Sequence, residues 1–128
     1  MKREISFRAY NKRDKKMYYN VQNTYDFGCT GDNSVMEDRF ADLLNDDEWV
    51  VMEYTGLSDK YGTKIFEGDI LREYSNVIDD WIVSYEYGKF IGTCDNVCED
   101  VYELSDLEVI GNICENNSES EVEKIWKI

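Results

Sequence analysis

Short segments of strand-forming residues, separated by turns rich in Gly, Asn and Asp, recur along this chain and limit the folds open to it. The clearest segment is 48–55, and the turn-rich stretch 56–62 follows it. Other segments with alternating or aromatic and β-branched residues lie at 4–10, 16–21, 69–74, 81–87, 90–92 and 107–113. This spacing is typical of small antiparallel proteins. We therefore expect a mainly-β fold, a small curled antiparallel sheet or partly open barrel with one or two short helices.

The first of these segments predicts a hairpin over residues 1–21. Alternation in 4–10 places Ile5, Phe7 and Ala9 on one face of a strand and the charged residues on the other. Residues 11–14 form a turn in this interpretation, and 16–21 returns as the second arm. The hairpin is basic, because residues 1–20 hold seven Lys and Arg against two acidic residues, a local net charge of +5.

A helix is expected between two of the strand candidates. Residues 23–34 are rich in Asn, Asp, Thr and Gly and indicate a surface loop. Ser34 and Glu37 have capping-box spacing, and Met36, Phe40, Leu43 and Leu44 follow on one helical face, which predicts a short acidic helix near 35–45. At the other end of the chain, 116–128 has an amphipathic pattern that fits a helix or a strand.

Length and hydropathy indicate one domain spanning 1–128, made of the basic hairpin, an acidic β body over 35–115 and the segment 116–128. A chain of 128 residues is long enough for an independent core. No apolar run approaches the roughly 20 residues that span a bilayer, and residues 1–8 lack the apolar stretch of a signal peptide. We therefore expect no membrane partner and a cytoplasmic location.

The residue types present restrict the chemistry. There is no His, which excludes Ser-His and Cys-His nucleophiles. The four cysteines, Cys29, Cys94, Cys98 and Cys114, do not show the paired spacing of a zinc site and are expected to be reduced thiols. Carboxylate pairs such as Asp79 and Asp80 are adjacent, so on a strand they point to opposite faces. We expect no catalytic residue, cofactor or metal, although a carboxylate-dependent metalloenzyme stays as a third hypothesis.

Charge favours protein partners over nucleic acid. The whole chain carries −14 and residues 1–20 carry +5, so the remaining 108 residues carry −19. This field repels nucleic acid and anionic membranes and attracts basic protein surfaces. Direct nucleic-acid binding is therefore not expected.

Three segments together resemble the YopX family of bacteriophage and prophage proteins. The first is 52–71, with the sequence MEYTGLSDKYGTKIFEGDIL, and the others are the opening REISFRAY with KMY and the closing LEVIGNI, followed by Glu115 and Asn116. The resemblance implies a mainly-β phage protein in the host bacterial cytoplasm, without known catalytic residues. The acidic middle and the Cys- and Asp-rich segment 94–106 depart from the pattern expected of that family.

Residues in the 52–71 segment allow two interpretations. Thr55, Asp59, Glu67 and Asp69 could form a polar site for a ligand or reaction. The structural interpretation is favoured, because Gly56, Gly62 and Gly68 suit turns with positive φ, and Asp59 and Asp69 can accept hydrogen bonds from nearby backbone amides.

The acidic surface with interleaved aromatics is the main functional candidate. We expect a phage accessory protein that binds a basic host protein, by imitating a phosphate backbone, and inhibits a nucleic-acid-processing or defence enzyme. The alternatives are a merely solubilising surface and a self-assembling module, in which the basic hairpin docks on a neighbouring copy. The candidate partner-binding residues are Asp42, Asp46, Asp47, Trp49, Asp79, Asp80, Tyr85, Tyr87, Glu99, Asp100 and Tyr102.

Overall fold

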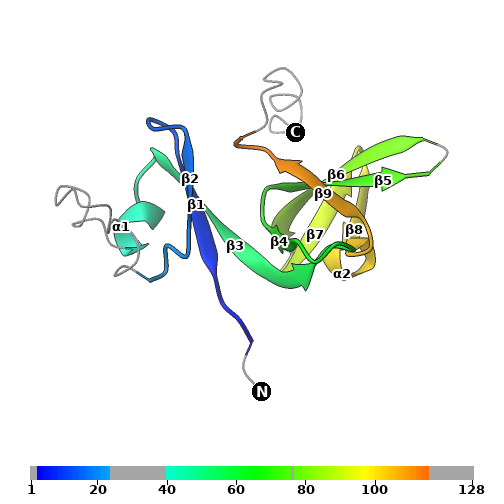
Figure 1. Ribbon diagram of the computed structural model, residues 1–128, viewed down its shortest axis with the longest axis horizontal. Helices are drawn as coiled ribbons and strands as arrows, with labels where there is room; N and C mark the ends of the chain where they lie inside the picture. The colour runs from blue at the N-terminus through cyan, green and yellow to red at the C-terminus, as the bar shows by residue number, and fades with distance from the viewer. Residues whose placement is uncertain (1–2, 24–39, 76, 116–128) are drawn as a thin grey trace. The chain divides into compact units, whose positions relative to one another are not determined.

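The computed structural model describes residues 3–23, 40–75 and 77–115. They are mainly strand, joined in antiparallel pairs, with two short helices, so the predicted fold class is confirmed (Figure 1). Within these ranges no helix has the length and apolar character needed to cross a membrane. Contacts group the chain into two compact units, Met1–Tyr54 and Thr55–Ile128, and each is described by itself.

The first unit contains the predicted basic hairpin. Strand β1 (Phe7–Asn11) pairs antiparallel with β2 (Lys16–Tyr19), and the exposed residues 12–15 form the turn between them. On its other side β1 pairs antiparallel with β3 (Trp49–Ser58), with Asn11 opposite Trp49. The order β2-β1-β3 makes β1 a central strand.

The first unit has a small hydrophobic core. Helix α1 (Phe40–Leu44) contributes the buried Leu43, which packs with Ala9 and Val21. The rings of Phe7 and Phe40 have centroids 4.8 Å apart. Of the helix predicted near 35–45, only the part from Phe40 is described. The loop residues 24–34 and the capping pair Ser34 and Glu37 lie outside the described residues.

The predicted face pattern of the first strand is wrong at two positions. Ile5 is 55% exposed and lies before β1 begins, whereas Arg8, expected on a solvent face, is only 4% exposed. The physical reason is that both faces of β1 carry buried residues, since the consecutive Arg8 and Ala9 point to opposite faces and are both buried, so alternation no longer separates buried from exposed residues.

The second unit is built on one antiparallel five-stranded sheet that curls as part of a barrel (Figure 1). Its strand order is β8-β7-β6-β5-β9, so neighbours along the chain are mostly neighbours in the sheet. A short strand, β4 (Lys64–Phe66), lies beside β3. The five strands are β5 (Asp69–Tyr74), β6 (Ile78–Glu86), β7 (Lys89–Cys94), β8 (Val97–Asp100) and β9 (Glu108–Asn112).

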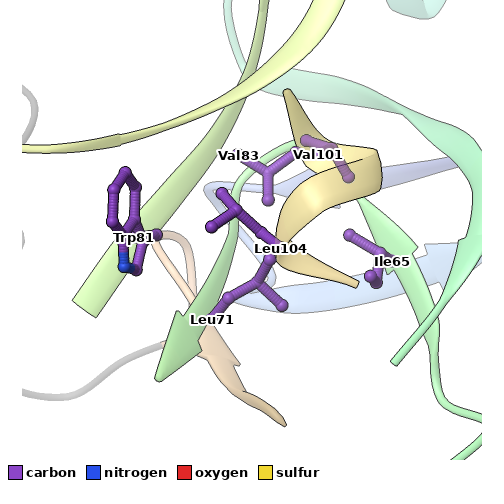
Figure 2. Close-up of a cluster of buried hydrophobic side chains, with 6 residues drawn as sticks. All are labelled: Ile65, Leu71, Trp81, Val83, Val101 and Leu104. Carbon is purple, nitrogen blue, oxygen red and sulfur yellow. The ribbon is translucent and has the colours of Figure 1, made fainter. Parts of the chain in front are cut away.

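Helix α2 (Val101–Leu104) covers the core face of this sheet (Figure 2). Its buried Val101 and Leu104 pack against strand residues that point to that face, together forming the cluster Ile65, Leu71, Trp81, Val83, Val101 and Leu104. A Cβ on Gly92 would collide with the Cδ1 of Leu104, so the absence of a side chain there lets the helix lie close to the sheet.

Several elements differ from the sequence prediction. The strand predicted over 48–55 continues to Ser58, because Gly56 adopts a φ of +89° inside it instead of ending it. Strands β4 and β8 and helix α2 were not predicted. The segment 116–128, predicted to pack as a helix or strand, lies outside the described residues.

Candidate functional site

The Asp59 carboxylate has a structural role in the turn after β3. Its Oδ1 accepts hydrogen bonds from the amides of Tyr61 and Thr63, both at 2.9 Å, and its Oδ2 accepts one from Val109, also at 2.9 Å. Burial alone raises the pKa of Asp59, but these three amide donors outweigh it and hold that pKa below its usual value. The group is therefore an ionised anchor between the turn and β9.

Thr55 and Asp69 of this segment are also hydrogen-bonded to the backbone. The Thr55 hydroxyl donates to the carbonyl of Ile65 at 2.7 Å, and the buried Asp69 accepts from the amide of Phe66 at 2.7 Å. Glu67 lies half-buried in the turn before Asp69. The backbone hydrogen bonds predicted for the two aspartates are present. Within the described ranges, no group of three or more His, Cys, Asp or Glu residues is arranged to hold a metal ion.

Adjacent candidate carboxylates of β6 lie on opposite faces of the sheet. Asp79 is on the same face as the core residues Trp81 and Val83, whereas Asp80 is on the other, outer face. Register places Glu99 of β8 opposite Gly92 on the core face and Asp100 opposite Ile91 on the outer face. The candidate residues of the second unit therefore divide into two sets.

The outer-face carboxylates are paired with cations. Asp80 receives two hydrogen bonds from Arg72, at 2.8 and 3.0 Å, and Asp100 lies 2.7 Å from the Lys89 ammonium. The pairing with Asp80 raises the pKa of Arg72, and the pairing with Asp100 raises that of Lys89. These two carboxylates are thus already neutralised within the molecule.

The core-face carboxylates have no such partner. Among the described residues, neither Asp79 nor Glu99 forms an ion pair, and Tyr85, six residues after Asp79 on β6, lies on the same face of the strand. Tyr85 packs edge-on against Phe90, with centroids 5.0 Å apart, and is still 54% exposed. We define the rim surface as the residues Asp79, Tyr85, Tyr87, Glu99 and Tyr102, with Asp79 near the start of β6 and the tyrosines Tyr85 and Tyr87 toward and beyond its other end.

Two tyrosines of the rim surface are held in solvent by local structure. Tyr87, with a φ of +57°, and Gly88, with a φ of +76°, form the two-residue turn between β6 and β7, as a type I′ hairpin requires. Tyr87 is consequently 89% exposed. Tyr102 points away from the core on the first turn of α2 and is 71% exposed.

The thiol of Cys94, at the end of β7, lies near several carboxylates of the second unit. Burial is the largest cause that raises the pKa of its thiol, and the negative charges of Asp79, Asp95, Asp80 and Glu73 raise it further. These causes disfavour the thiolate form of Cys94, which is the nucleophilic form of a cysteine.

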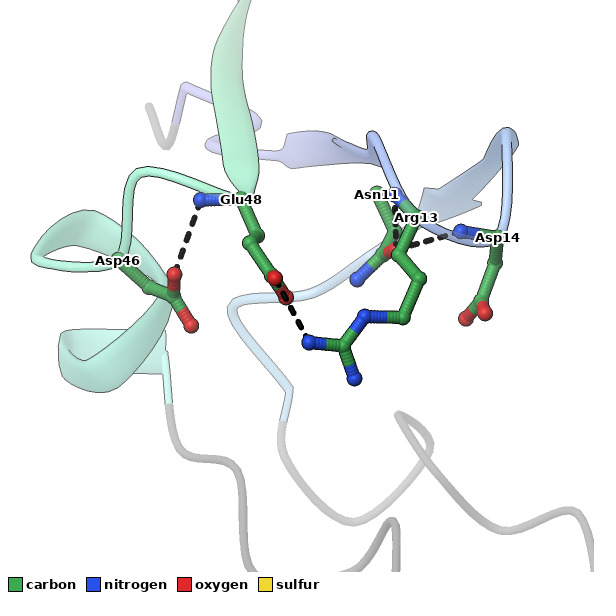
Figure 3. A network of polar contacts seen from close by, with 5 residues as sticks. All are labelled: Asn11, Arg13, Asp14, Asp46 and Glu48. Carbon is green, nitrogen blue, oxygen red and sulfur yellow. Dashed lines mark hydrogen bonds and ion pairs between the residues drawn. The ribbon is translucent and has the colours of Figure 1, made fainter.

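Two of the candidate partner-binding residues of the first unit, Asp46 and Trp49, make contacts within that unit. The Asp46 carboxylate accepts a hydrogen bond from the Glu48 amide at 2.9 Å, and Glu48 in turn binds Arg13 at 2.7 Å (Figure 3). Trp49 is half-buried, with its ring 5.5 Å from that of Tyr18. Asp42 lies in the first turn of α1, and Asp47 is exposed in the loop before β3.

Comparisons with known proteins agree with this structure. The family model described as YopX protein matches residues 6–119, most of the chain. The chain belongs to the YopX family. The match includes the Asp59 turn, the five-stranded sheet and the hairpin of the first unit, so the resemblance noted in the sequence is confirmed.

A solved structure is similar to this YopX-family chain over nearly its whole length. The crystal structure of protein EF1440 from Enterococcus faecalis has 30% sequence identity and a TM-score of 0.61, and the match covers 91% of this chain and 98% of that one. No curated protein matches the chain.

Proposed function

We propose that this protein acts by protein–protein binding, with the rim surface as its contact site and a basic surface of the partner opposite it. The observation that carries the proposal is the charge contrast between the two faces of the second unit's sheet. Asp80 and Asp100 have cationic partners, whereas Asp79 and Glu99 form no ion pair within the described part of the chain. Carboxylates without a cationic partner, together with exposed aromatic side chains, suit a basic partner.

The amino-acid composition around these residues also favours a basic partner. Between residues 79 and 106 the chain carries eight carboxylates and a single basic residue, Lys89. Such a field accelerates encounter with basic proteins and discourages acidic ones. Exposed tyrosines offer large contact area at low entropic cost, which is why they are enriched at interfaces.

We further infer that the partner is a host enzyme whose basic channel normally holds nucleic acid, and that this protein inhibits it in the bacterial cytoplasm as a phage or prophage product. The support is the acidic body of −19 net charge, the membership of the YopX family and the structural use of the polar signature residues. A carboxylate surface can occupy a site built for phosphate, because both present clustered negative oxygens.

The test is affinity capture from nuclease-treated bacterial lysate with elution by a salt gradient. Wild-type protein is compared with a variant carrying Asp79→Lys and Glu99→Lys, and with a matched control carrying Glu4→Lys and Asp106→Lys, which changes net charge equally. We expect one basic nucleic-acid enzyme to be retained by wild type and control but not by the rim variant. Equal retention by all three proteins would contradict the proposal.

A second candidate is self-assembly through the basic turn of the first unit. Lys12, Lys15 and Lys16 are exposed there, next to Arg13, which binds Glu48, so the three lysines can meet the acidic face of another copy. Light scattering at low and moderate salt distinguishes the two functions. A concentration-dependent oligomer that salt dissociates supports self-assembly, and a monomer at every concentration excludes it.

A further inference from the structure

The end of the β5–β6 hairpin extends beyond the strands that flank it. Strand β9 pairs with β5 only as far as Arg72, and β7 pairs with β6 only from Ile82 onward. The cross-strand pair Tyr74–Ile78 therefore belongs to a two-stranded ribbon, which Figure 1 shows projecting from the sheet. A two-stranded ribbon is marginally stable without further contacts.

One face of this ribbon exposes large apolar side chains. Tyr74 and Ile78 are cross-strand partners, so both lie on the outer face of the sheet, as Asp80 does. They are 57% and 60% exposed. The other pair of the ribbon, Glu73–Asp79, sets two like charges against each other on the opposite face and takes no part in this surface.

The turn after β3 extends the apolar area. The Lys60 ammonium lies 5.2 Å from the ring centroid of Tyr61 and 5.9 Å from that of Tyr74, so the two rings border the same ammonium. Tyr61 is 69% exposed, and the hydrogen bond from its amide to Asp59 fixes its backbone. The two rings and Ile78 form an exposed patch of a kind that marks protein interfaces.

Two charged groups at the border of this patch form no ion pair within the described part of the chain. One is the Lys60 ammonium. The other is the Glu108 carboxylate, which accepts a hydrogen bond from the Tyr74 hydroxyl at 3.0 Å. Arg72 lies opposite Glu108 on the outer face, but its guanidinium binds Asp80. We define the ribbon surface as the residues Lys60, Tyr61, Tyr74, Ile78 and Glu108.

We propose that the ribbon surface is an interface between two copies of this chain related by a two-fold axis. In a two-fold interface the same surface meets itself, so a surface with one unpaired cation and one unpaired anion is self-complementary. Lys60 of each copy binds Glu108 of the other, and the apolar side chains of the two copies cover one another. Apolar burial provides most of the affinity, and the ion pairs fix the orientation.

The distribution of charge favours a second copy as the occupant. Two chains with a net charge of −14 repel each other in most orientations. At the border of the ribbon surface, Lys60 and Arg72 balance Asp80 and Glu108, so two copies can meet there without a local excess of negative charge. The inference is independent of the proposed function, because the carboxylates of the rim surface lie on the opposite face of the sheet.

Sedimentation velocity of the full chain at about 5 to 200 μM protein tests this interface. We expect a monomer–dimer equilibrium that persists at about 500 mM NaCl, because salt does not screen apolar contacts. Lys60→Glu and Glu108→Lys should each weaken the dimer by about tenfold, since each sets like charges against each other. An equimolar mixture of the two variants should restore the dimer, because one chain then presents two carboxylates and the other two ammonium groups at facing positions.

A second comparison tests the apolar contact. Ile78→Ser should weaken the dimer by about tenfold, and Val97→Ser, at an exposed aliphatic residue of β8, should weaken it by less than about twofold. Lys16→Glu, at an exposed lysine of the first unit, is the charge control and should leave the dimer in place. Circular dichroism verifies that each variant is folded.

A wild-type chain that is monomeric at every concentration overturns the proposal. It is also overturned if the mixture of Lys60→Glu and Glu108→Lys is no more dimeric than either variant alone, or if Ile78→Ser and Val97→Ser have equal effects. A dimer that salt dissociates and Lys16→Glu abolishes overturns it too, since assembly then uses the basic turn of the first unit. Lysate capture by the rim surface is a separate result and succeeds or fails independently.

Discussion

Among single residues, Asp59 connects three backbone amides of the second unit. We predict that Asp59→Asn lowers the free energy of unfolding by about 1–3 kcal/mol, because the new amide NH₂ faces an amide donor and leaves one contact unmade. Urea denaturation followed by tryptophan fluorescence measures the change. The control is Asp95→Asn, a substitution in an exposed turn that is expected to change little. Equal midpoints for the two variants would contradict the anchoring role.

The lowered pKa of Asp59 also predicts a pH dependence. An unfolded aspartate titrates near about 3.9, and the folded group titrates below that value. The stabilisation it contributes is therefore present above about pH 4 and disappears as pH falls through the folded pKa. We expect the stability difference between wild type and Asp59→Asn to be smaller at about pH 2.5 than at about pH 6. A difference that is constant with pH would show that the charge of Asp59 contributes nothing.

At the scale of elements, the contact between α2 and the sheet depends on Gly92. A Cβ at this position collides with Leu104, so Gly92→Ala should destabilise the protein by about 1–3 kcal/mol as the helix shifts. Gly111→Ala is the control, because a Cβ at Gly111 meets nothing within 4 Å and its φ is not positive. Thermal unfolding compares the two variants, and the same melting temperature for both would contradict the packing described for α2.

The β5–β6 hairpin predicts stability changes of opposite sign at neighbouring positions. Glu73→Gln removes a repulsion and should raise the free energy of unfolding by about 0.2–1 kcal/mol. Asp80→Asn removes a partly exposed ion pair with Arg72 and should lower it by a few tenths to about 1 kcal/mol. Denaturant titration at low salt measures both. A loss of stability in Glu73→Gln would mean that the hydrogen bond from the Trp81 indole to Glu73 outweighs the repulsion from Asp79.

The sequence predicted the elements whose alternation was long enough to be read. The hairpin arms, β5, β6, β7 and β9 have clear strand composition, and Asn11 to Asp14 has turn composition. Strand β4 has three residues and helix α2 has four, which is too few to show a period. All four residues of β8 are exposed, so this strand shows no alternation of apolar and polar residues. Arg8 was misplaced because one segment does not show that both faces of its strand are covered.

For the candidate site, the sequence predicted which types of residue lie at the surface but not which of them form ion pairs. Acidic residues and tyrosines were correctly expected at the surface, but which carboxylates are neutralised depends on pairing across strands. Asp80 and Asp100 have cations opposite or beside them, whereas Asp79 faces another carboxylate. That distinction needs the register of the sheet, which local sequence does not specify.

At the scale of the whole molecule, the proposed function depends on electrostatic attraction between the acidic body and a basic partner. The most direct test is the dependence on ionic strength of the Kd for the partner captured from lysate. We predict that the Kd for wild type rises by about tenfold or more between about 50 and 300 mM NaCl, as screening shortens the reach of the rim carboxylates. The Asp79→Lys and Glu99→Lys variant should bind weakly at every salt concentration. A wild-type Kd that does not change with salt would contradict the central claim.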